Sequence, residues 1–135
     1  MAKQPTMTIL TIRTDKPQAE IGLFQSHNQL AYQKWQAHRE LATTIHKELD
    51  KLLNKSSKSL KDIEGIVCFK GPGSFTGLRI GLSAGNALAY GLNIPIAASS
   101  GEDWIKTGIK DLLGGKTDNV AMPDYGAPAK TTTPK

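Results

Sequence analysis

The sequence has few of the residues that build disulfide frameworks, metal clusters and aromatic RNA-binding surfaces. Its single cysteine, Cys68, excludes a disulfide framework and any site that needs several cysteine ligands. Cys68 lies in the apolar run 66–69, so we expect a small buried side chain, and the composition suits a reducing compartment. The aromatic residues are scattered and form no RNA-binding signature: they are Phe24, Tyr32, Trp35, Phe69, Phe75, Tyr90, Trp104 and Tyr125.

Long apolar segments are also missing. Residues 1–8 contain no apolar stretch of the kind found in a signal peptide. The longest uncharged stretch, 80–98, is interrupted by polar residues, by Gly91 and by Pro95. It predicts a helix followed by a strand, because a membrane span needs ~20 predominantly apolar residues. We therefore expect a cytoplasmic protein with no membrane partner.

The charge of the chain is positive but dispersed. A formal net charge of +5 favours contact with RNA or another anionic surface. The lysines are spread along the whole chain and never form a dense run, so a moderately basic surface is the simpler interpretation. The length of 135 residues predicts one domain that can bury a core without disulfides or metals.

The glycine-rich segment 71–81 lacks the residue that would make it a phosphate-binding catalytic loop. A Walker loop needs Gly-Lys-Ser/Thr, whereas Gly77 is followed by Leu78. Backbone N–H groups of residues 71–74 could still face an anion at a helix N-terminus. The alternative is a tight turn in which Ser74 caps the helix.

Other catalytic and metal-binding patterns are missing too. The sequence has no Gly-x-Ser-x-Gly nucleophile elbow. His38 and His46 are eight residues apart, His27 lies in a turn, and no His-x-x-x-His pair occurs, so we expect no metal site. Asp15 and Glu20 lie near the first turn without a recognisable acid–base partner.

Hydrophobic periodicity changes along the chain from that of strands to that of helices. Residues 7–12, 20–25 and 29–35 predict an antiparallel meander because the turns between them are short. After residue 37 an amphipathic helix is predicted to about residue 54, followed by a strand at 63–69, a helix at 74–90, a strand at 93–98 and a helix at 102–113. This order predicts an α/β fold of the ribonuclease-H-like (actin-like ATPase) class, with a mixed five-stranded sheet and three helices.

The second predicted helix carries an unusual number of small residues. Gly77, Gly81 and Gly85 share one side with Ala84, and Gly91 is expected to end the helix. Each glycine inside a helix costs up to ~1 kcal/mol relative to alanine, so a compensating close contact is expected. That contact is either with this chain's own sheet or with a partner helix.

The central segment closely resembles the signature of the TsaB (YeaZ) family. The matching residues are Lys70, Gly71, Pro72, Gly73, Ser74, Phe75, Thr76, Gly77, Leu78, Arg79, Ile80 and Gly81. The resemblance continues through residues 91–96, Ser99 and Ser100, and includes residues 9–12 and 38–41, so that it covers roughly residues 7–113.

The resemblance implies a role in tRNA modification. TsaB is the non-catalytic partner of TsaD in bacterial tRNA N6-threonylcarbamoyladenosine synthesis, at the adenosine next to the anticodon. By this resemblance the chain has no catalytic residue and docks TsaD, or a second copy of itself, through its first two helices. TsaE and tRNA would join through the larger complex, and ADP or ATP would lie at the complex interface rather than on this chain alone. The interface residues carried over are His38, Leu41, Ala42, Ile45, Leu49, Gly77, Gly81, Ser83 and Ala84.

The chain departs from the family pattern in two places. The first strand of this superfamily usually ends in Asp-Thr, where the Asp serves a nucleotide–metal site; here it ends in Arg13-Thr14. The chain also ends after the first of the two subdomains of TsaB, although residues 122–126 resemble a Pro-x-Tyr segment near TsaB C-termini. We expect a shortened TsaB with a flexible N-terminus at 1–6, a TsaB-like subdomain at 7–113 and an extended tail at 114–135 that adds nothing to the core.

Two other functions remain as alternatives. One is a nucleotide hydrolase or peptidase-like enzyme of the same superfamily, and the other is an accessory protein that binds tRNA directly. If the small residues of the second helix meet a partner, Gly81→Leu is expected to abolish complex formation while the isolated domain stays folded.

Overall fold

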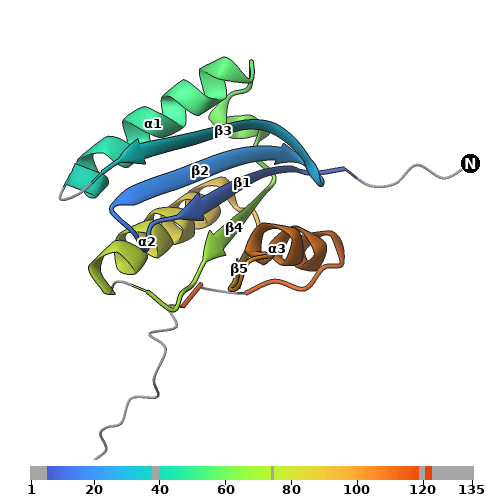
Figure 1. The fold of residues 1–135 in the computed structure, drawn as a ribbon. Helices are drawn as coiled ribbons and strands as arrows, with labels where there is room; N and C mark the ends of the chain where they lie inside the picture. Colours follow the sequence, from blue (N-terminus) through green and yellow to red (C-terminus); the bar gives the residue numbers. More distant parts are fainter. Residues whose placement is uncertain (1–5, 38–39, 74, 119–120, 123–135) are drawn as a thin grey trace, which may run out of the picture.

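The computed structural model describes residues 6–37, 40–73, 75–118 and 121–122. Its sheet has five strands in the order β3-β2-β1-β4-β5 (Figure 1). These are β1 (Thr8–Arg13), β2 (Gln18–Gln25), β3 (Asn28–Gln36), β4 (Gly65–Phe69) and β5 (Ile96–Ser99). The helices are α1 (Leu41–Lys55), α2 (Phe75–Leu92) and α3 (Trp104–Leu113), with a 3-10 turn, η2 (Leu60–Asp62), before β4. The predicted mixed five-stranded sheet with three helices is confirmed.

β1 is the central strand, and it joins the two halves of the sheet. It pairs antiparallel with β2, and β2 with β3, because short turns connect these strands. It pairs parallel with β4, and β4 with β5, where helical crossovers return the chain to the same end of the sheet. The carboxyl ends of β1, β4 and β5 therefore lie at one end of the sheet, where the Arg13 guanidinium lies over the Phe69 ring.

The helices cover opposite faces of this sheet. Gly85 of α2 packs over Cys68, whereas Gly108 of α3 packs over the preceding residue, Val67. Since neighbouring residues of a strand point to opposite faces, α2 and α3 lie on opposite sides of β4 (Figure 1). α1 lies on the same face as α2, where it covers β2 and β3.

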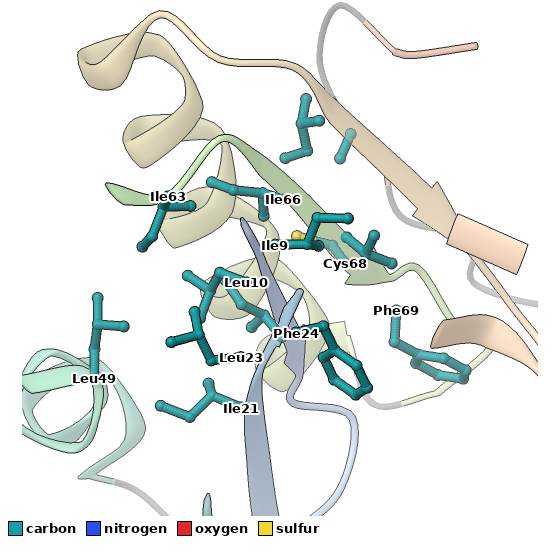
Figure 2. Close-up of a cluster of buried hydrophobic side chains, with 14 of the residues drawn as sticks. Ile9, Leu10, Ile21, Leu23, Phe24, Leu49, Ile63, Ile66, Cys68 and Phe69 are labelled. Atoms are coloured by element: carbon teal, nitrogen blue, oxygen red, sulfur yellow. The ribbon is translucent and has the colours of Figure 1, made fainter. Parts of the chain in front are cut away.

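Apolar side chains fill both sides of the sheet. Figure 2 shows Leu10, Ile21 and Leu23 near Leu49 of α1. Cys68 is 1% exposed, which confirms the small buried residue that the sequence predicts. Burial raises the pKa of the Cys68 thiol to about 12.

Several element boundaries differ from the prediction. α2 continues through Gly91, and the left-handed residue after the helix is Asn93, with φ 58°. Asparagine adopts this conformation more readily than most residues, so the chain does not need a glycine to leave the helix. β5 begins at Ile96 rather than at residue 93, and α3 begins at Trp104 rather than at residue 102.

Part of the predicted tail packs against the fold. Asp118 forms an isolated antiparallel bridge with Ile96, and its carboxylate accepts a hydrogen bond of 2.9 Å from the backbone N–H of Ala98. Ala121 is 2% exposed and belongs to the core, contrary to the expectation that nothing after residue 113 contributes to it. None of the described helices is long and apolar enough to cross a membrane.

Candidate partner-docking site

The glycine-rich segment leaves the carboxyl end of β4 and packs against the end of β1. Gly71 has a φ of 113°, a conformation that side-chain-bearing residues rarely adopt. A Cβ atom at Gly73 would lie 2.6 Å from the Cβ of Asp15, so this turn also needs glycine for close approach. Ser74, the predicted N-cap, lies outside the described residues. The backbone conformation of Gly71 and the close packing of Gly73 therefore explain why glycine occupies both positions, without a bound anion.

Arg13 joins the ends of β1 and β4. Its Nε donates to Asp15 Oδ1 at 2.7 Å, and its Nη2 donates to Asp15 Oδ2 at 3.2 Å. The guanidinium carbon lies 3.8 Å from the centre of the Phe69 ring. The hydrogen bond with Asp15 raises the pKa of Arg13 despite partial burial. The side chains of Arg13 and Asp15 are only 19% and 7% exposed, so the pair is part of the packed structure.

These residues do not fit a magnesium–nucleotide site. Mg²⁺ prefers free carboxylate oxygens, but the first strand ends in a cation, and both oxygens of Asp15 accept hydrogen bonds from it. The Asp15 carboxylate also lies against Gly73, where its negative charge would oppose an anion held by the turn. In the part of the chain that the structure describes, no group of three His, Cys, Asp or Glu residues is placed to hold a metal ion.

Gly77, Gly81 and Gly85 of α2 contact this chain's own sheet or the residue that follows β1. Thr14 Oγ1 donates to the carbonyl of Gly77 at 2.6 Å, and a Cβ atom at Gly81 would overlap the same Thr14 hydroxyl. A Cβ at Gly85 would lie 2.5 Å from Cys68 Sγ. Of the two contacts left open by the sequence, these three glycines make the one with the sheet. The expectation that Gly81→Leu leaves the domain folded is therefore wrong, because leucine has no space there.

The opposite side of α2 borders an open groove of about 490 Å³ between α1 and α2. Two rows of α2 residues at four-residue spacing form one wall. Arg79, Ser83 and Ala87 are exposed, while Ile80, Ala84 and Leu88 are half-buried. The other wall comes from α1. We call this surface the α1/α2 groove; it is lined by Ala42, Ile45, His46, Arg79, Ile80, Ser83, Ala84, Ala87 and Leu88.

The structure separates the predicted interface residues into two groups. Ala42, Ile45, Ser83 and Ala84 line the α1/α2 groove. Leu41 and Leu49 of α1 are 5% and 7% exposed and belong to the core. Gly77 and Gly81 contact Thr14, which directly follows β1. His38 lies outside the described residues.

Sequence reasoning missed five residues of the groove. These are His46, Arg79, Ile80, Ala87 and Leu88. The recurrence of Arg79, Ser83 and Ala87 every four residues on a helix otherwise poor in polar groups was the signal for an exposed row. His46 lies on α1 between Ala42 and Asp50 at the same spacing. We therefore regard the exposed rows, rather than the glycine row, as the candidate contact surface.

The strand order and pairing define the class of protein. Three antiparallel strands followed by two parallel strands, with helices on both faces, form a ribonuclease-H-like fold of the actin-like superfamily. A solved structure described as YeaZ from Pseudomonas aeruginosa superimposes with a TM-score of 0.65 at 26% identity, covering 70% of this chain and 44% of that one.

Sequence comparison identifies the family. The family model described as TsaD, tRNA N6-adenosine threonylcarbamoyltransferase, matches residues 33–101, about half of the chain. The TsaB protein of Bacillus subtilis is 35% identical over 94 residues, which are 70% of this chain. The chain belongs to the TsaB (YeaZ) family, as its central signature predicts.

Two further relatives show how the similarity is distributed. The TsaB protein of Escherichia coli is 38% identical over 69 residues, 47% of this chain and 30% of that protein. A tRNA N6-adenosine threonylcarbamoyltransferase of Geotalea daltonii is 42% identical over 60 residues, 44% of this chain and 18% of that protein. The chain also spans 41% of the Bacillus subtilis TsaB protein, so it matches less than half the length of these relatives.

Proposed function

We propose that this chain is a non-catalytic scaffold subunit in tRNA N6-threonylcarbamoyladenosine synthesis and that it docks TsaD through α1 and α2. The α1/α2 groove is the observation that carries this proposal. Names of relatives that take part in threonylcarbamoyladenosine biosynthesis support the pathway. TsaD would then provide the chemistry, and TsaE and tRNA would join the assembly through it, in the cytoplasm.

The shape of the α1/α2 groove suits an approaching helix. The three half-buried residues of α2, Ile80, Ala84 and Leu88, form an i±4 row, which is the kind of ridge that packs into the groove of a neighbouring helix. The small side chains of Ala42, Ser83 and Ala87 leave space in the groove for the backbone of a partner helix. The 18 residues of α2 span ~27 Å, long enough to present several turns to a partner.

The end of β1 supports the non-catalytic part of the proposal. Arg13 is paired with Asp15 and stacked on Phe69 where active relatives in this superfamily need a free carboxylate. We propose that the chain alone binds no nucleotide and that any ADP or ATP lies at the interface with TsaD. ATP hydrolysis or peptide cleavage by the purified chain would contradict this.

Co-expression with the cognate TsaD, followed by size-exclusion chromatography, tests the docking. Ser83→Arg places a long charged side chain in the groove at an exposed position, so the domain should fold and TsaD should no longer co-elute. Asn54→Arg adds the same charge at an exposed position of α1 outside the groove and should leave the complex intact. If Ser83→Arg still co-elutes with TsaD at the wild-type yield, the groove is not the docking site.

A further inference from the structure

The charge inside the α1/α2 groove carries information about the partner. Among its lining residues, Arg79 and His46 are the ones that can carry charge, and none is an Asp or Glu. Asp50 follows His46 by one helical turn but does not line the groove. Whatever covers the groove must therefore accommodate a guanidinium on an otherwise apolar and small-residue surface.

Arg79 is available to a partner. It is exposed, and within the described residues no hydrogen bond or ion pair occupies its guanidinium. The other described arginine, Arg13, shows the contrast, because Asp15 holds it in two hydrogen bonds. When a guanidinium is covered without a carboxylate or comparable acceptor, it loses hydration that nothing replaces.

We propose that the groove takes a helix whose apolar face carries a carboxylate opposite Arg79, and that this pair determines which partner binds. This inference rests on the docking function proposed above and specifies its chemistry. Arg79 would fix the position of the partner helix through a bidentate contact, and the small residues at 83, 84 and 87 would allow the two backbones to approach closely.

A second copy of this chain fits the groove less well. In a two-fold symmetric dimer the same patch meets itself, so that groove would face groove. The lining residues that can carry charge would then be Arg79 and His46 on both sides, with no carboxylate from either lining. Arg79 would then be covered on both sides without a carboxylate from the facing groove, whereas an acidic partner supplies one.

Two substitutions of Arg79 and one distant control test the inference with purified chain and cognate TsaD, using the equilibrium dissociation constant as the readout. Arg79→Glu should weaken binding at least about 30-fold, because it opposes the partner carboxylate. Arg79→Met keeps the length of the side chain without its charge and should also weaken binding, since the carboxylate loses its pair. Lys106→Glu, at an exposed position of α3 on the other face of the sheet, changes net charge equally to Arg79→Glu and should have little effect.

The outcomes separate this inference from the docking function. If Arg79→Met binds TsaD as tightly as wild type or more tightly, an apolar surface lies opposite and the acidic-partner inference is wrong. If Ser83→Arg prevents binding while both Arg79 variants bind normally, docking at the groove stands and the charge pair does not. If TsaD binding is unchanged in all these variants, TsaD does not dock at the α1/α2 groove. Sedimentation of the chain alone completes the test, because dimerisation tighter than TsaD binding and lost in Ser83→Arg would assign the groove to a second copy.

Discussion

At Gly81, α2 lies so close to the residue that follows β1 that there is no space for a side chain. An added Cβ would overlap the Thr14 hydroxyl, which itself donates to Gly77 in the preceding turn. We expect Gly81→Ala to lower the free energy of unfolding by about 1–3 kcal/mol, because overpacking outweighs the gain in helix propensity. Urea denaturation monitored by circular dichroism measures this difference.

Gly91 provides the matched control within the same helix. It is exposed, and a Cβ there would meet nothing within 4 Å. Gly91→Ala should therefore raise the free energy of unfolding by about 0.5–1 kcal/mol through helix propensity alone. If both variants were stabilised equally, the close contact between Gly81 and Thr14 would not exist in solution.

The buried Cys68 thiol gives a second prediction for a single residue. Burial raises its pKa to about 12, whereas an unfolded chain holds a cysteine near pKa 8.5. Above about pH 8.5 the unfolded state loses this proton while the folded state keeps it, so the stability contributed by Cys68 falls as pH rises toward 12. Denaturation between pH 8 and 10 should show a smaller decline for Cys68→Ala than for wild type.

Thiol chemistry checks the same burial independently. Ellman's reagent at pH 8 should react with Cys68 in urea-unfolded protein and remain nearly unreactive toward the folded chain. Tyr32, whose pKa burial also raises, is present in both proteins of the pH comparison and cancels from their difference. Rapid modification of the native protein would contradict the structure around Cys68.

For single residues, the sequence indicated that Arg13 is unusual but not which side chains it contacts. Arg13 stood out because a cation replaced an expected carboxylate, but nothing in the sequence showed that Asp15 and Phe69 hold it. The Asp15 contact is local, two residues along the chain, yet it depends on the bend after β1. The Phe69 contact depends on the parallel register of β1 and β4, which a single sequence does not specify.

Among the elements, α2 is held by the chain that follows α3. The Asn86 side chain donates to the carbonyl of Ala121 at 3.0 Å and accepts from its backbone N–H at 2.8 Å. Asn86→Ala removes both hydrogen bonds next to a buried residue, so we expect a loss of about 1–3 kcal/mol in the free energy of unfolding. Thermal and urea denaturation of the full chain measure this loss.

Asn86→Asp distinguishes the two hydrogen bonds. Aspartate can still accept from the Ala121 N–H but cannot donate to its carbonyl, so its stability should lie below that of wild type. At Asn54, an exposed residue of α1, substitution by alanine should change stability by less than about 0.5 kcal/mol. An Asn86→Ala variant as stable as Asn54→Ala would mean that the segment around Ala121 does not support α2.

The orientation of α2 could not be derived from its sequence alone. Glycine and alanine lie on one side and isolated polar residues on the other, and small residues suit either a sheet or a partner helix equally well. The structure decides because Thr14 and Cys68 fill the space that the missing side chains of Gly81 and Gly85 leave. For α1 the periodicity predicted the helix but not which residues meet a partner, because Leu41 and Leu49, which the resemblance carried over as interface residues, are buried in this chain's own core.

For the whole molecule, connection lengths were sufficient to predict the sheet. Turns of a few residues after β1 and β2 allow only antiparallel neighbours, and the helices before β4 and β5 allow parallel ones. The groove was harder to predict because it combines rows from two helices that are about 20 residues apart in sequence. Its depth depends on how far α1 and α2 separate across the sheet, which the pattern of either helix does not contain.

The distribution of charge over the whole chain predicts how it meets tRNA. The net charge of +5 is dispersed, so the chain alone should contact few phosphates at once. We expect fluorescence anisotropy to show at least about tenfold weaker tRNA binding by the chain alone than by its mixture with TsaD at 200 mM salt. Ser83→Arg adds a positive charge but should not be recruited into the tRNA-bound complex, because it cannot dock. Strong binding by the chain alone, falling steeply between 50 and 200 mM salt and unaffected by TsaD, would instead support direct tRNA recognition, since counterion release would then act on this chain's own surface.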